Sequence, residues 1–372
     1  MRTLKAKTSQ NRKGCEVLKN VLLITDKLIT GGAETYFCKL ENQLNHPDIT
    51  VYTAAAMGEL YSKIQYKKRF TPLSRKNHLH NLYVLWKKVR TCKIDIIHAN
   101  SLRMVMYAVC VNRVLRKKVK ILYTKHNVTV LEQKAKGLFC KLVNSFVHGV
   151  ITVSRFEQEQ LMSIGVNSSK VTTIYNGVDL NQFMFKEKAA SLDCHIGLLA
   201  RASKEKNHEL FIEIASLLKG NEHMKFHIGG GGPELQRIQE LIQQQGLSEK
   251  IKIWGEVEDP EAFIKKMDML LLTSHREVFP MVVLEAMAVG TPMISIDVGG
   301  VKEAIADGDT GYLIPTYSPQ AFAEKITELY AEQEQKQRFA KGAREKVEQH
   351  FTSSQMIAST ANQYVNMSGK SF

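Results

Sequence analysis

Residues 269–300 have the sequence MLLLTSHREVFPMVVLEAMAVGTPMISIDVGG. An apolar stretch of strand length at 269–273 is followed by a polar loop, and a stretch of helical length begins at Pro280, since proline is favoured in the first turn of a helix. A second short apolar stretch occupies 293–296. A strand, a helix and a strand in this order predict two parallel strands joined by a right-handed crossover.

The same alternation continues outward in both directions. Candidate strands are short stretches rich in β-branched and apolar residues, at 21–25, 50–54, 94–98, 120–124, 149–153, 171–174, 194–199, 225–228 and 250–253. Candidate helices are stretches of helical length and pattern, at 33–44, 102–115, 131–146, 207–218, 233–245, 280–288 and 320–349. The chain is therefore predicted to be an α/β protein with doubly wound parallel sheets.

A chain of 372 residues is too long for one ordinary core, and domains of roughly 150–200 residues are expected. Hydrophobic periodicity is weak near residues 183–190, so we place a boundary there. We expect a basic leader at 1–18, a Rossmann-like domain at 19–186, a second at 187–350, and a terminal helical segment at 351–372 that packs back on the first domain. Ligands of such sheets bind beyond the carboxyl ends of the strands, so functional residues should lie in strand-to-helix loops.

The composition, with 44% hydrophobic and 24% charged residues, is typical of a globular protein. No apolar run approaches the roughly 18–20 residues needed to cross a bilayer. Residues 1–18 lack the apolar centre of a secretory signal, so we expect a cytoplasmic protein. The six cysteines have no metal-like or redox-like spacing, which predicts reduced thiols rather than a disulfide or zinc site.

Positive charge is concentrated in the first half of the chain. Residues 1–190 contain 32 Lys and Arg against 12 Asp and Glu, a net charge of +20, whereas the remainder carries −6. The basic clusters lie at 67–69, 75–76, 87–90 and 113–120. This asymmetry indicates an anionic partner. We favour the anionic inner face of a membrane, with a solvated basic surface as the alternative, and we expect no nucleic acid because no recognised motif interleaves these charges with aromatic residues.

Two glycine-rich loops follow candidate strands. Gly31 and Gly32 precede a helix, where paired glycines let the backbone approach a ligand and the helix start offers amides to an anion. Gly230 and Gly232 lie in a second loop that leads into a helix at Pro233. Each loop is equally compatible with an ordinary turn or helix entry. The first lacks the GxGxxG spacing, which disfavours an NAD-dependent oxidoreductase.

Charged residues follow two strands of the second half. Arg201 and Lys206 come after the strand at 194–199, where two cations are suited to clamp a diphosphate, although exposed surface charge is the alternative. Glu277 lies in a loop and Glu285 lies about a turn and a half inside the following helix. The rise of about 1.5 Å per residue separates the two carboxylates, so they reach two ends of one extended ligand rather than one atom.

In this order, the motifs resemble those of the family-four retaining glycosyltransferases, whose GT-B fold has two Rossmann-like domains facing a central cleft. The resemblance covers nearly the whole chain after about Lys19 and is highly specific as an ordered set. The matching segments are GGAE (31–34), VSRFEQEQL (153–161), IYNGVDLNQF (174–183), LLARASKEKN (198–207), GGGGPEL (229–235), KIWGEVED (252–259), the loop from Glu277, and EAMAVGTPMISIDVGGVKEAIADGDTGYLI (285–314).

The resemblance implies roles for individual positions. Glu285 matches the residue that holds the ribose of the nucleotide, and Glu277 matches the residue that touches the hydroxyls of the donor sugar. Arg201 and Lys206 match the diphosphate clamp. Gly32 matches the glycine loop over the diphosphate.

Further contacts are implied around these residues. His126 matches a histidine of the first domain that contacts the donor sugar, whereas His98, one strand earlier, is more typical of a structural histidine. Gly230 and Gly232 belong to the loop beside the nucleotide. Gly231 replaces the usual acidic residue, which puts a base or loop contact in doubt. The stretch whose backbone meets the phosphates and the sugar matches Phe279, Pro280, Met281 and Val282.

The resemblance implies a metal-independent, retaining hexosyltransferase that uses a nucleotide-diphosphate sugar, with a UDP-sugar favoured. The first domain of this fold supplies most of the acceptor surface, and its positive charge favours a glycan or lipid-linked acceptor in cell-envelope polysaccharide synthesis, with a soluble acceptor as the alternative. Fixed cations and helix-start amides would take the place of a metal, and no cofactor is expected. Asp307 and Asp309 have an Asp-x-Asp spacing but lie in a turn. The alternatives are a nucleotide-sugar epimerase and a non-catalytic nucleotide-sugar-binding protein on the same fold.

Overall fold

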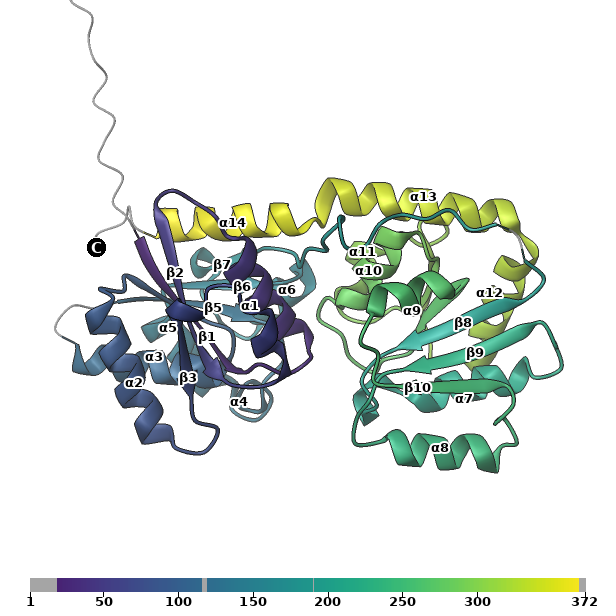
Figure 1. Ribbon diagram of the computed structural model, residues 1–372, viewed down its shortest axis with the longest axis horizontal. Coiled ribbons are helices and arrows are strands. Elements are labelled where there is room, and N and C mark those ends of the chain that lie inside the picture. The colour runs from purple at the N-terminus through teal and green to yellow at the C-terminus, as the bar shows by residue number, and fades with distance from the viewer. Residues whose placement is uncertain (1–18, 116–118, 190, 368–372) are drawn as a thin grey trace, which may run out of the picture.

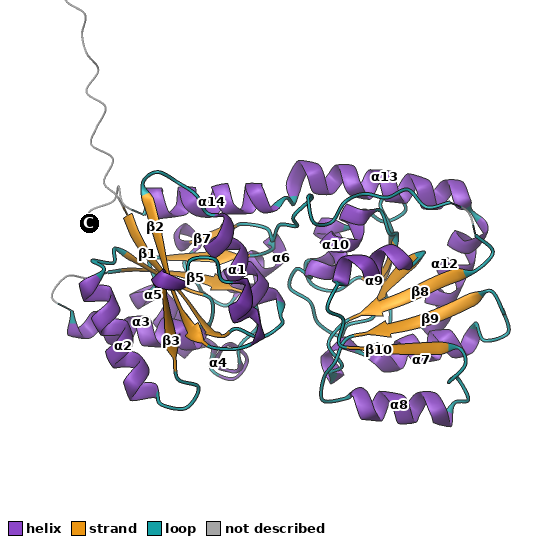
Figure 2. Ribbon diagram, in the orientation of Figure 1, coloured by secondary structure: helices purple, strands orange, loops and turns teal. Residues whose placement is uncertain are grey.

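The computed structural model describes residues 19–115, 119–189 and 191–367. The expected basic leader at 1–18 and part of the basic cluster at 113–120 lie outside the described residues. The chain forms two α/β bodies side by side, and the last two helices, α13 (Gln333–His350) and α14 (Ser353–Asn366), run along one side of both (Figure 1). Strands occupy the middle of each body, and helices surround them (Figure 2).

The first body contains a seven-stranded sheet in the order β3-β2-β1-β4-β5-β6-β7, and every neighbouring pair is parallel. Its strands are β1 (Lys19–Lys27), β2 (Ile49–Ala56), β3 (Phe70–Leu73), β4 (Ile96–Ala99), β5 (Lys120–Lys125), β6 (Gly149–Thr152) and β7 (Val171–Thr173). Its helices are α1 (Gly32–Gln43), α2 (His78–Thr91), α3 (Leu102–Val114), α4 (Val130–Lys134), α5 (Lys136–Phe146) and α6 (Arg155–Ser163), with short 3-10 turns at Glu59–Lys63, Lys67–Arg69 and Ser168–Lys170.

The second body contains a six-stranded parallel sheet in the order β10-β9-β8-β11-β12-β13. Its strands are β8 (Cys194–Leu199), β9 (Met224–Gly229), β10 (Ile251–Gly255), β11 (Met269–Leu272), β12 (Met293–Ile296) and β13 (Tyr312–Ile314). Its helices are α7 (His208–Leu217), α8 (Leu235–Gln244), α9 (Pro260–Lys266), α10 (Met281–Val289), α11 (Val301–Ala304), α12 (Pro319–Ala331) and α13, with a 3-10 turn at Lys204–Lys206.

Both sheets have the strand order of a doubly wound fold, so the prediction of two Rossmann-like domains is confirmed. In each sheet the order reverses at one point, between β1 and β4 in the first domain and between β8 and β11 in the second. The crevice beyond the carboxyl ends of the strands at such a point is where ligands bind in this architecture. The loops after these four strands are therefore the first places to look for a site.

Some predicted elements differ from the structure. The single helix expected at 320–349 is two helices, because Glu332, with φ −109° and ψ 87°, leaves the helical conformation between them. The helix expected at 131–146 is likewise divided at Ala135. Strand β3 was not predicted; it contains Pro72, which cannot donate to a ladder and is tolerated because β3 is an edge strand.

The C-terminal helix α14 packs on the first domain although α13 packs on the second. Met356, Ile357 and Ala361 are buried in the same apolar cluster as Val21 and Phe37 of the first sheet and α1. Residues 178 and 351–353 run side by side through two backbone hydrogen bonds, both of 2.9 Å. The two segments in which the chain passes between the domains are therefore bonded to each other, and together they form the joint between the domains.

No helix in the described ranges 19–115, 119–189 and 191–367 is long and apolar enough to cross a membrane.

Candidate active site

The carboxyl ends of β8 and β11 bring two of the predicted residues into contact. Lys206 ends the 3-10 turn after β8, and its Nζ lies 2.6 Å from Oε1 of Glu277 in the loop after β11. The hydroxyl of Thr273 donates to the carbonyl oxygen of Lys206 at 3.0 Å, which ties the two loops together. The side chains of Lys206 and Glu277 are 25% and 8% exposed, so the pair opens to solvent mainly on the lysine side.

Arg201 lies on the same loop as Lys206 and is exposed. Within the part of the chain that the structure describes, its guanidinium has no hydrogen-bond or ion-pair partner. An unpaired arginine five residues from an ion-paired lysine supplies a planar set of donors for an anion. Asn207, the residue after Lys206, has φ +49°, which is a left-handed conformation. Asparagine tolerates this conformation better than most residues do, so the position does not require glycine.

The glycine loop after β9 supports the loop that carries Arg201. Gly230 and Gly232 have φ +126° and +152°, which side chains rarely adopt. A Cβ atom at Gly230 would lie 2.0 Å from the carbonyl oxygen of Ala200, and one at Gly232 would lie 2.4 Å from that of Ala202. These glycines therefore permit close backbone packing against the loop that carries Arg201, and their contact with the nucleotide stays a prediction.

Helix α10 begins beside the Lys206–Glu277 pair. Pro280 is its N-terminal cap residue and forms no side-chain cap, so the amides of Met281 and Val282 are available at the positive end of the helix dipole. Phe279 is buried, with its ring 5.1 Å from Tyr175 and its carbonyl oxygen bound by Nδ2 of Asn176 at 3.1 Å. The ring of Phe279 thus fastens the start of the helix to the end of the first domain.

Glu285 faces a different group from Glu277. Burial raises the pKa of the Glu285 carboxyl, and the positive charge of Lys39 on α1 acts in the opposite direction. Lys39 is fixed by donation from its Nζ to the carbonyl oxygen of Gly177 at 2.7 Å, and burial lowers its pKa. The two glutamates predicted to serve two ends of one ligand therefore lie in separate environments, one beside Lys206 and one opposite α1 of the first domain.

Two of the predicted site residues, Gly32 and His126, belong to the first domain. Gly32 begins α1, is exposed, and has open space where a Cβ would stand. His126 follows β5, its ring lies 4.8 Å from that of Tyr36, and its buried Nε2 has no hydrogen-bond partner among the described residues. Burial lowers the pKa of His126 to about 3, so the ring is neutral and can hydrogen-bond a hydroxyl.

His98 has a structural role. Its Nδ1 lies 2.6 Å from the hydroxyl of Tyr364 on α14, and its Nε2 lies 2.6 Å from the hydroxyl of Thr124. Both ring nitrogens are therefore satisfied inside the first domain, which agrees with the interpretation favoured from the sequence.

A charged cluster at the end of β5 was not identified from the sequence. Lys125, immediately before His126, is completely buried and forms ion pairs with Glu132 of α4 and Glu157 of α6. The sequence signal was a lysine at the end of an apolar strand, next to a candidate site histidine. A buried lysine requires such partners, but its burial is visible only once the strand is placed in the sheet.

The two domains meet around a cavity of about 290 Å³. Its lining comes from α4, α5 and α6 of the first domain and, in the second, from the loop that carries Glu277 and the Gly299 turn after β12. Gly299 has φ +60°, and a Cβ there would lie 1.8 Å from the carbonyl oxygen of Glu277. The turn and the Glu277 loop are thus closely packed, and Glu277 lies at the wall of this cavity.

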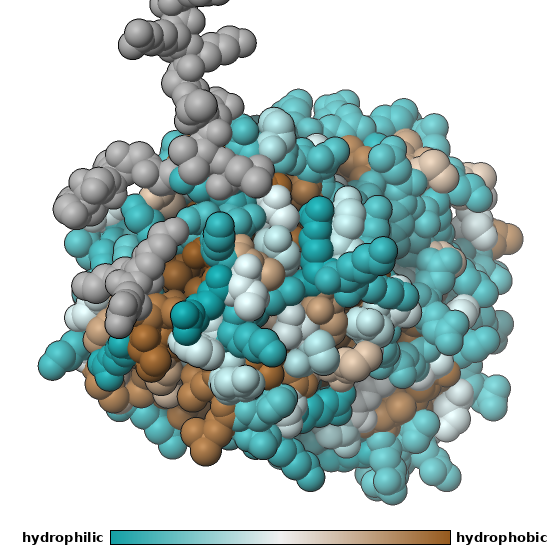
Figure 3. Space-filling view, turned by 60° about the vertical axis from the view of Figure 1, so that its left-hand side comes forward, coloured by the Kyte–Doolittle hydropathy of each residue, from teal (hydrophilic) through white to brown (hydrophobic). Residues whose placement is uncertain are grey.

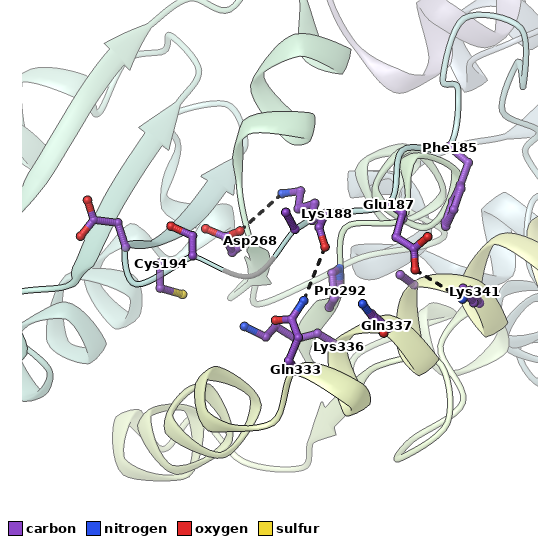
Figure 4. Close-up of a pocket in the computed structure, with 15 residues that line it drawn as sticks. Phe185, Glu187, Lys188, Cys194, Asp268, Pro292, Gln333, Lys336, Gln337 and Lys341 are labelled. Atoms are coloured by element: carbon purple, nitrogen blue, oxygen red, sulfur yellow. Dashed lines mark hydrogen bonds and ion pairs between the residues drawn. The ribbon is translucent and has the colours of Figure 1, made fainter.

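A second cavity lies at the opposite ends of the strands, by the first residue of β8, Cys194 (Figure 4). Lys188 and Asp268 form an ion pair of 4.0 Å there, and Gln333 donates to the carbonyl oxygen of Lys188 at 3.5 Å. Its interior volume is only about 30 Å³, which is too small for a sugar. The cleft at the carboxyl ends is the candidate active site.

Comparisons with known proteins place these features in a family. The family described as Glycosyltransferase Family 4 matches residues 30–182, and the family described as Glycosyl transferases group 1 matches residues 181–346. This protein is a family-four glycosyltransferase. The two matches meet at the joint between the domains, so both halves of the glycosyltransferase are accounted for.

Three similar proteins illustrate the range of the family. N-acetyl-alpha-D-glucosaminyl L-malate synthase of Bacillus anthracis is 24% identical over 280 residues, which are 71% of this glycosyltransferase and 73% of that protein. The putative colanic acid biosynthesis glycosyltransferase WcaL of Salmonella typhimurium is 29% identical over 213 residues, 54% and 52% of the two chains. The solved structure of Anabaena HepE in complex with UDP and glucose has a TM-score of 0.80 at 20% identity and covers 94% of this chain and 100% of its own. The GT-B fold predicted from the motifs is therefore confirmed.

No group of three or more His, Cys, Asp or Glu side chains suited to a metal ion occurs within residues 19–115, 119–189 and 191–367. Asp307 accepts a hydrogen bond from the amide of Leu313 at 2.8 Å, so this carboxylate stabilises its turn. Arg201 and Lys206 lie in the loop after β8, and Glu277 lies in the loop after β11.

Proposed function

We propose that this glycosyltransferase transfers a sugar from a UDP-sugar, with retention of anomeric configuration and without a metal ion, to a glycan or lipid-linked acceptor in the synthesis of a cell-envelope polysaccharide. Glycosyl transfer in polysaccharide or glycoconjugate synthesis is the activity of the family to which the chain belongs. The identity of the donor, the stereochemistry of transfer and the identity of the acceptor go beyond this shared activity and are part of the proposal.

The observation that carries the proposal is the ion pair of Lys206 and Glu277 at the reversal point of the second sheet, beside the unpaired Arg201. In the proposed reaction, the bond between the anomeric carbon and the diphosphate oxygen breaks. A bond from the acceptor oxygen to that carbon forms on the same face, and the proton of the acceptor hydroxyl passes to the departing diphosphate. The two cations and the amides at the start of α10 would stabilise the negative charge that grows on this group.

The preference for UDP is supported by the structural similarity to HepE, whose solved structure contains UDP and glucose. The polysaccharide pathway is supported by the similarity to a putative colanic acid glycosyltransferase. Glu285, near the middle of α10, is the residue we assign to the ribose. His126 is assigned to the donor sugar, because its neutral ring has a free nitrogen to offer a hydroxyl.

We further propose that the first domain attaches reversibly to an anionic membrane surface. Lys67, Lys68 and Arg69 are exposed on one 3-10 turn, and Lys87 and Arg90 are exposed on α2. Large apolar side chains accompany them on α2 and α3, including Leu79 at 80% exposure and Val114 at 71%. Figure 3 brings the first domain forward and shows brown apolar patches among teal hydrophilic surface. Basic residues around apolar ones suit an interface with anionic lipid.

A donor screen tests the proposed function. The protein is incubated with UDP-, GDP- and ADP-sugars, first alone and then with simple glycoside acceptors, and released nucleotide and sugar products are analysed by NMR. We expect UDP release and an α-linked product from an α-linked UDP-sugar. Interconversion of sugars without nucleotide release would identify an epimerase, and tight donor binding without turnover would identify a binding protein.

A further inference from the structure

The charged cluster at the end of β5 lies against the cavity between the domains. Lys125 is 0% exposed, its Nζ lies 3.1 Å from Oε2 of Glu132, and it also bonds Oε1 of Glu157. Glu132 and Glu157 belong to the lining of the 290 Å³ cavity, together with Glu277 from the second domain. The cluster therefore forms part of the first-domain wall, opposite the residue that we assign to the donor sugar.

Local structure holds both carboxylates in place. Each glutamate is the third residue of its helix, where Thr129 caps α4 and Ser154 caps α6. Glu132 accepts from the amide of Thr129 at 3.2 Å and so completes a capping box. Anchored in this way, the carboxylates cannot change position without breaking the start of a helix or the ion pair with Lys125.

The balance of charge in the cluster sets its chemical preference. At formal charges, one lysine and two glutamates leave a net charge of −1, and all three side chains are less than 10% exposed. Carboxylate oxygens accept hydrogen bonds and cannot donate them. The cations that also line the cavity, Lys136 and Arg276, are both exposed, and Arg276 can donate to the amide oxygen of Gln133 at 3.0 Å. Exposed charges of this kind are largely screened by salt, whereas buried charges such as this cluster are screened much less.

We propose that this cavity binds the sugar ring of the acceptor. Glu132 and Glu157 accept hydrogen bonds from the hydroxyl or amino groups of this ring. The net negative charge of the cluster excludes an acceptor with a carboxylate or phosphate at this position. The proposal rests on the proposed function and narrows its acceptor to a neutral or amino sugar. A cavity of about 290 Å³ is just below the roughly 300–1,000 Å³ range of drug-sized ligand sites, which suits a single sugar ring. The relative from Bacillus anthracis is named for L-malate, an acidic acceptor, so the two proteins are expected to differ here.

Three probes with the same ring test this preference: methyl β-glucoside, methyl β-glucosaminide and methyl β-glucuronide, which are neutral, cationic and anionic at pH 7. Their dissociation constants are measured by saturation-transfer NMR with the protein saturated with UDP. We expect the neutral and cationic probes to bind at least about tenfold more tightly than the anionic one, because like charges brought together in a desolvated site repel.

The informative variant is Glu157→Gln. It leaves one lysine and one glutamate, so no charge remains buried without a partner and the protein should fold. Discrimination against the glucuronide should fall to about threefold or less, since the net charge of the cluster becomes zero. The matched control is Glu159→Gln, the same change at an exposed position of the same helix, which should keep the discrimination of the parent.

Each outcome is decisive. Equal or tighter binding of the glucuronide, binding of none of the three probes, or unchanged discrimination in Glu157→Gln would overturn the proposal. The affinity for UDP, measured on the same samples, distinguishes a failure of this proposal from a failure of the proposed function. If the unmodified protein does not bind UDP, the donor assignment is wrong. If it binds UDP but does not discriminate between the three probes, only the acceptor assignment is wrong.

Discussion

The hydroxyl of Tyr175 in the first domain donates to Oε2 of Glu303 in the second at 2.8 Å. The same carboxylate accepts from the backbone amides of Arg155 and Phe156, each at 2.8 Å, and so caps the start of α6 across the domain boundary. Burial, followed by the hydrogen bond to Glu303, raises the pKa of Tyr175 to about 12, so the phenol remains a donor. The carboxylate of Glu303 thus holds the second domain against the start of α6 in the first domain.

Replacing Glu303 with alanine should loosen this contact. A lost helix cap costs about 0.5–2 kcal/mol, and here the loss falls on the arrangement of the domains because the cap comes from the other domain. We expect a larger radius of gyration in small-angle X-ray scattering and a lower kcat. Lys302→Ala, an exposed neighbour on α11, is the control. Unchanged scattering and kcat in Glu303→Ala would show that the contact does not set the domain arrangement.

Removing either cation of the second domain should weaken the donor site. A charge-assisted hydrogen bond is commonly worth about 1.5–3 kcal/mol, so Arg201→Ala and Lys206→Ala should each reduce UDP affinity roughly 10- to 150-fold and reduce turnover. Calorimetry with UDP measures the first effect. Lys204→Ala, an exposed lysine on the same 3-10 turn, should change neither property. If both variants bind UDP as tightly as the parent, the diphosphate assignment is wrong.

The sequence predicted much of this arrangement but not the contacts inside it. Strands β8 and β12 were predicted to the residue, because each is a short and mainly apolar stretch. Lys206 and Glu277 were both named as candidates, yet their ion pair joins positions 71 residues apart and follows only from the order of strands in the sheet.

Other features gave weaker signals in the sequence. Gly230 and Gly232 were assigned to the loop beside the nucleotide, which stays a prediction. Their φ angles and the nearby carbonyl oxygens add a packing role against residues 200–202 that the sequence did not reveal. Lys125 was overlooked because a lysine in a short strand is usually exposed, and its two partners lie on separate helices.

Chelation should leave turnover intact. In the proposed mechanism, Arg201 and Lys206 stabilise the departing diphosphate, so no divalent ion is required. Initial rates are measured after dialysis against EDTA, with and without added magnesium or manganese, and a known metal-dependent glycosyltransferase serves as the positive control. Activity that disappears with EDTA and returns only with a divalent metal would refute this mechanism.

The two glutamates should give different defects. Glu285 is assigned to the ribose, so Glu285→Ala should weaken UDP and UDP-sugar alike. Glu277 is assigned to the donor sugar, so Glu277→Ala should retain UDP affinity and lose most transfer. Because Glu277 also pairs with Lys206, Glu277→Gln is a useful companion that keeps a hydrogen-bond acceptor beside Nζ. Equal losses of UDP affinity in the alanine variants would reject this division of roles.

Attachment to membranes should depend on charge and decrease with salt. Each Lys or Arg near an anionic surface contributes about 1 kcal/mol, and the attraction falls off within a Debye length of roughly 10 Å at 0.1 M salt. We expect co-sedimentation with vesicles containing phosphatidylserine, release at high salt, and little binding to phosphatidylcholine alone. The double variant Lys68→Glu and Lys87→Glu changes two exposed residues of the first domain and should abolish sedimentation, whereas Lys219→Glu, exposed on the second domain, should not. Retention on the vesicles at high salt would indicate that Leu79, Val114 and their apolar neighbours insert into the bilayer. Equal sedimentation with both lipids, or none with either, would contradict the proposal of electrostatic attachment.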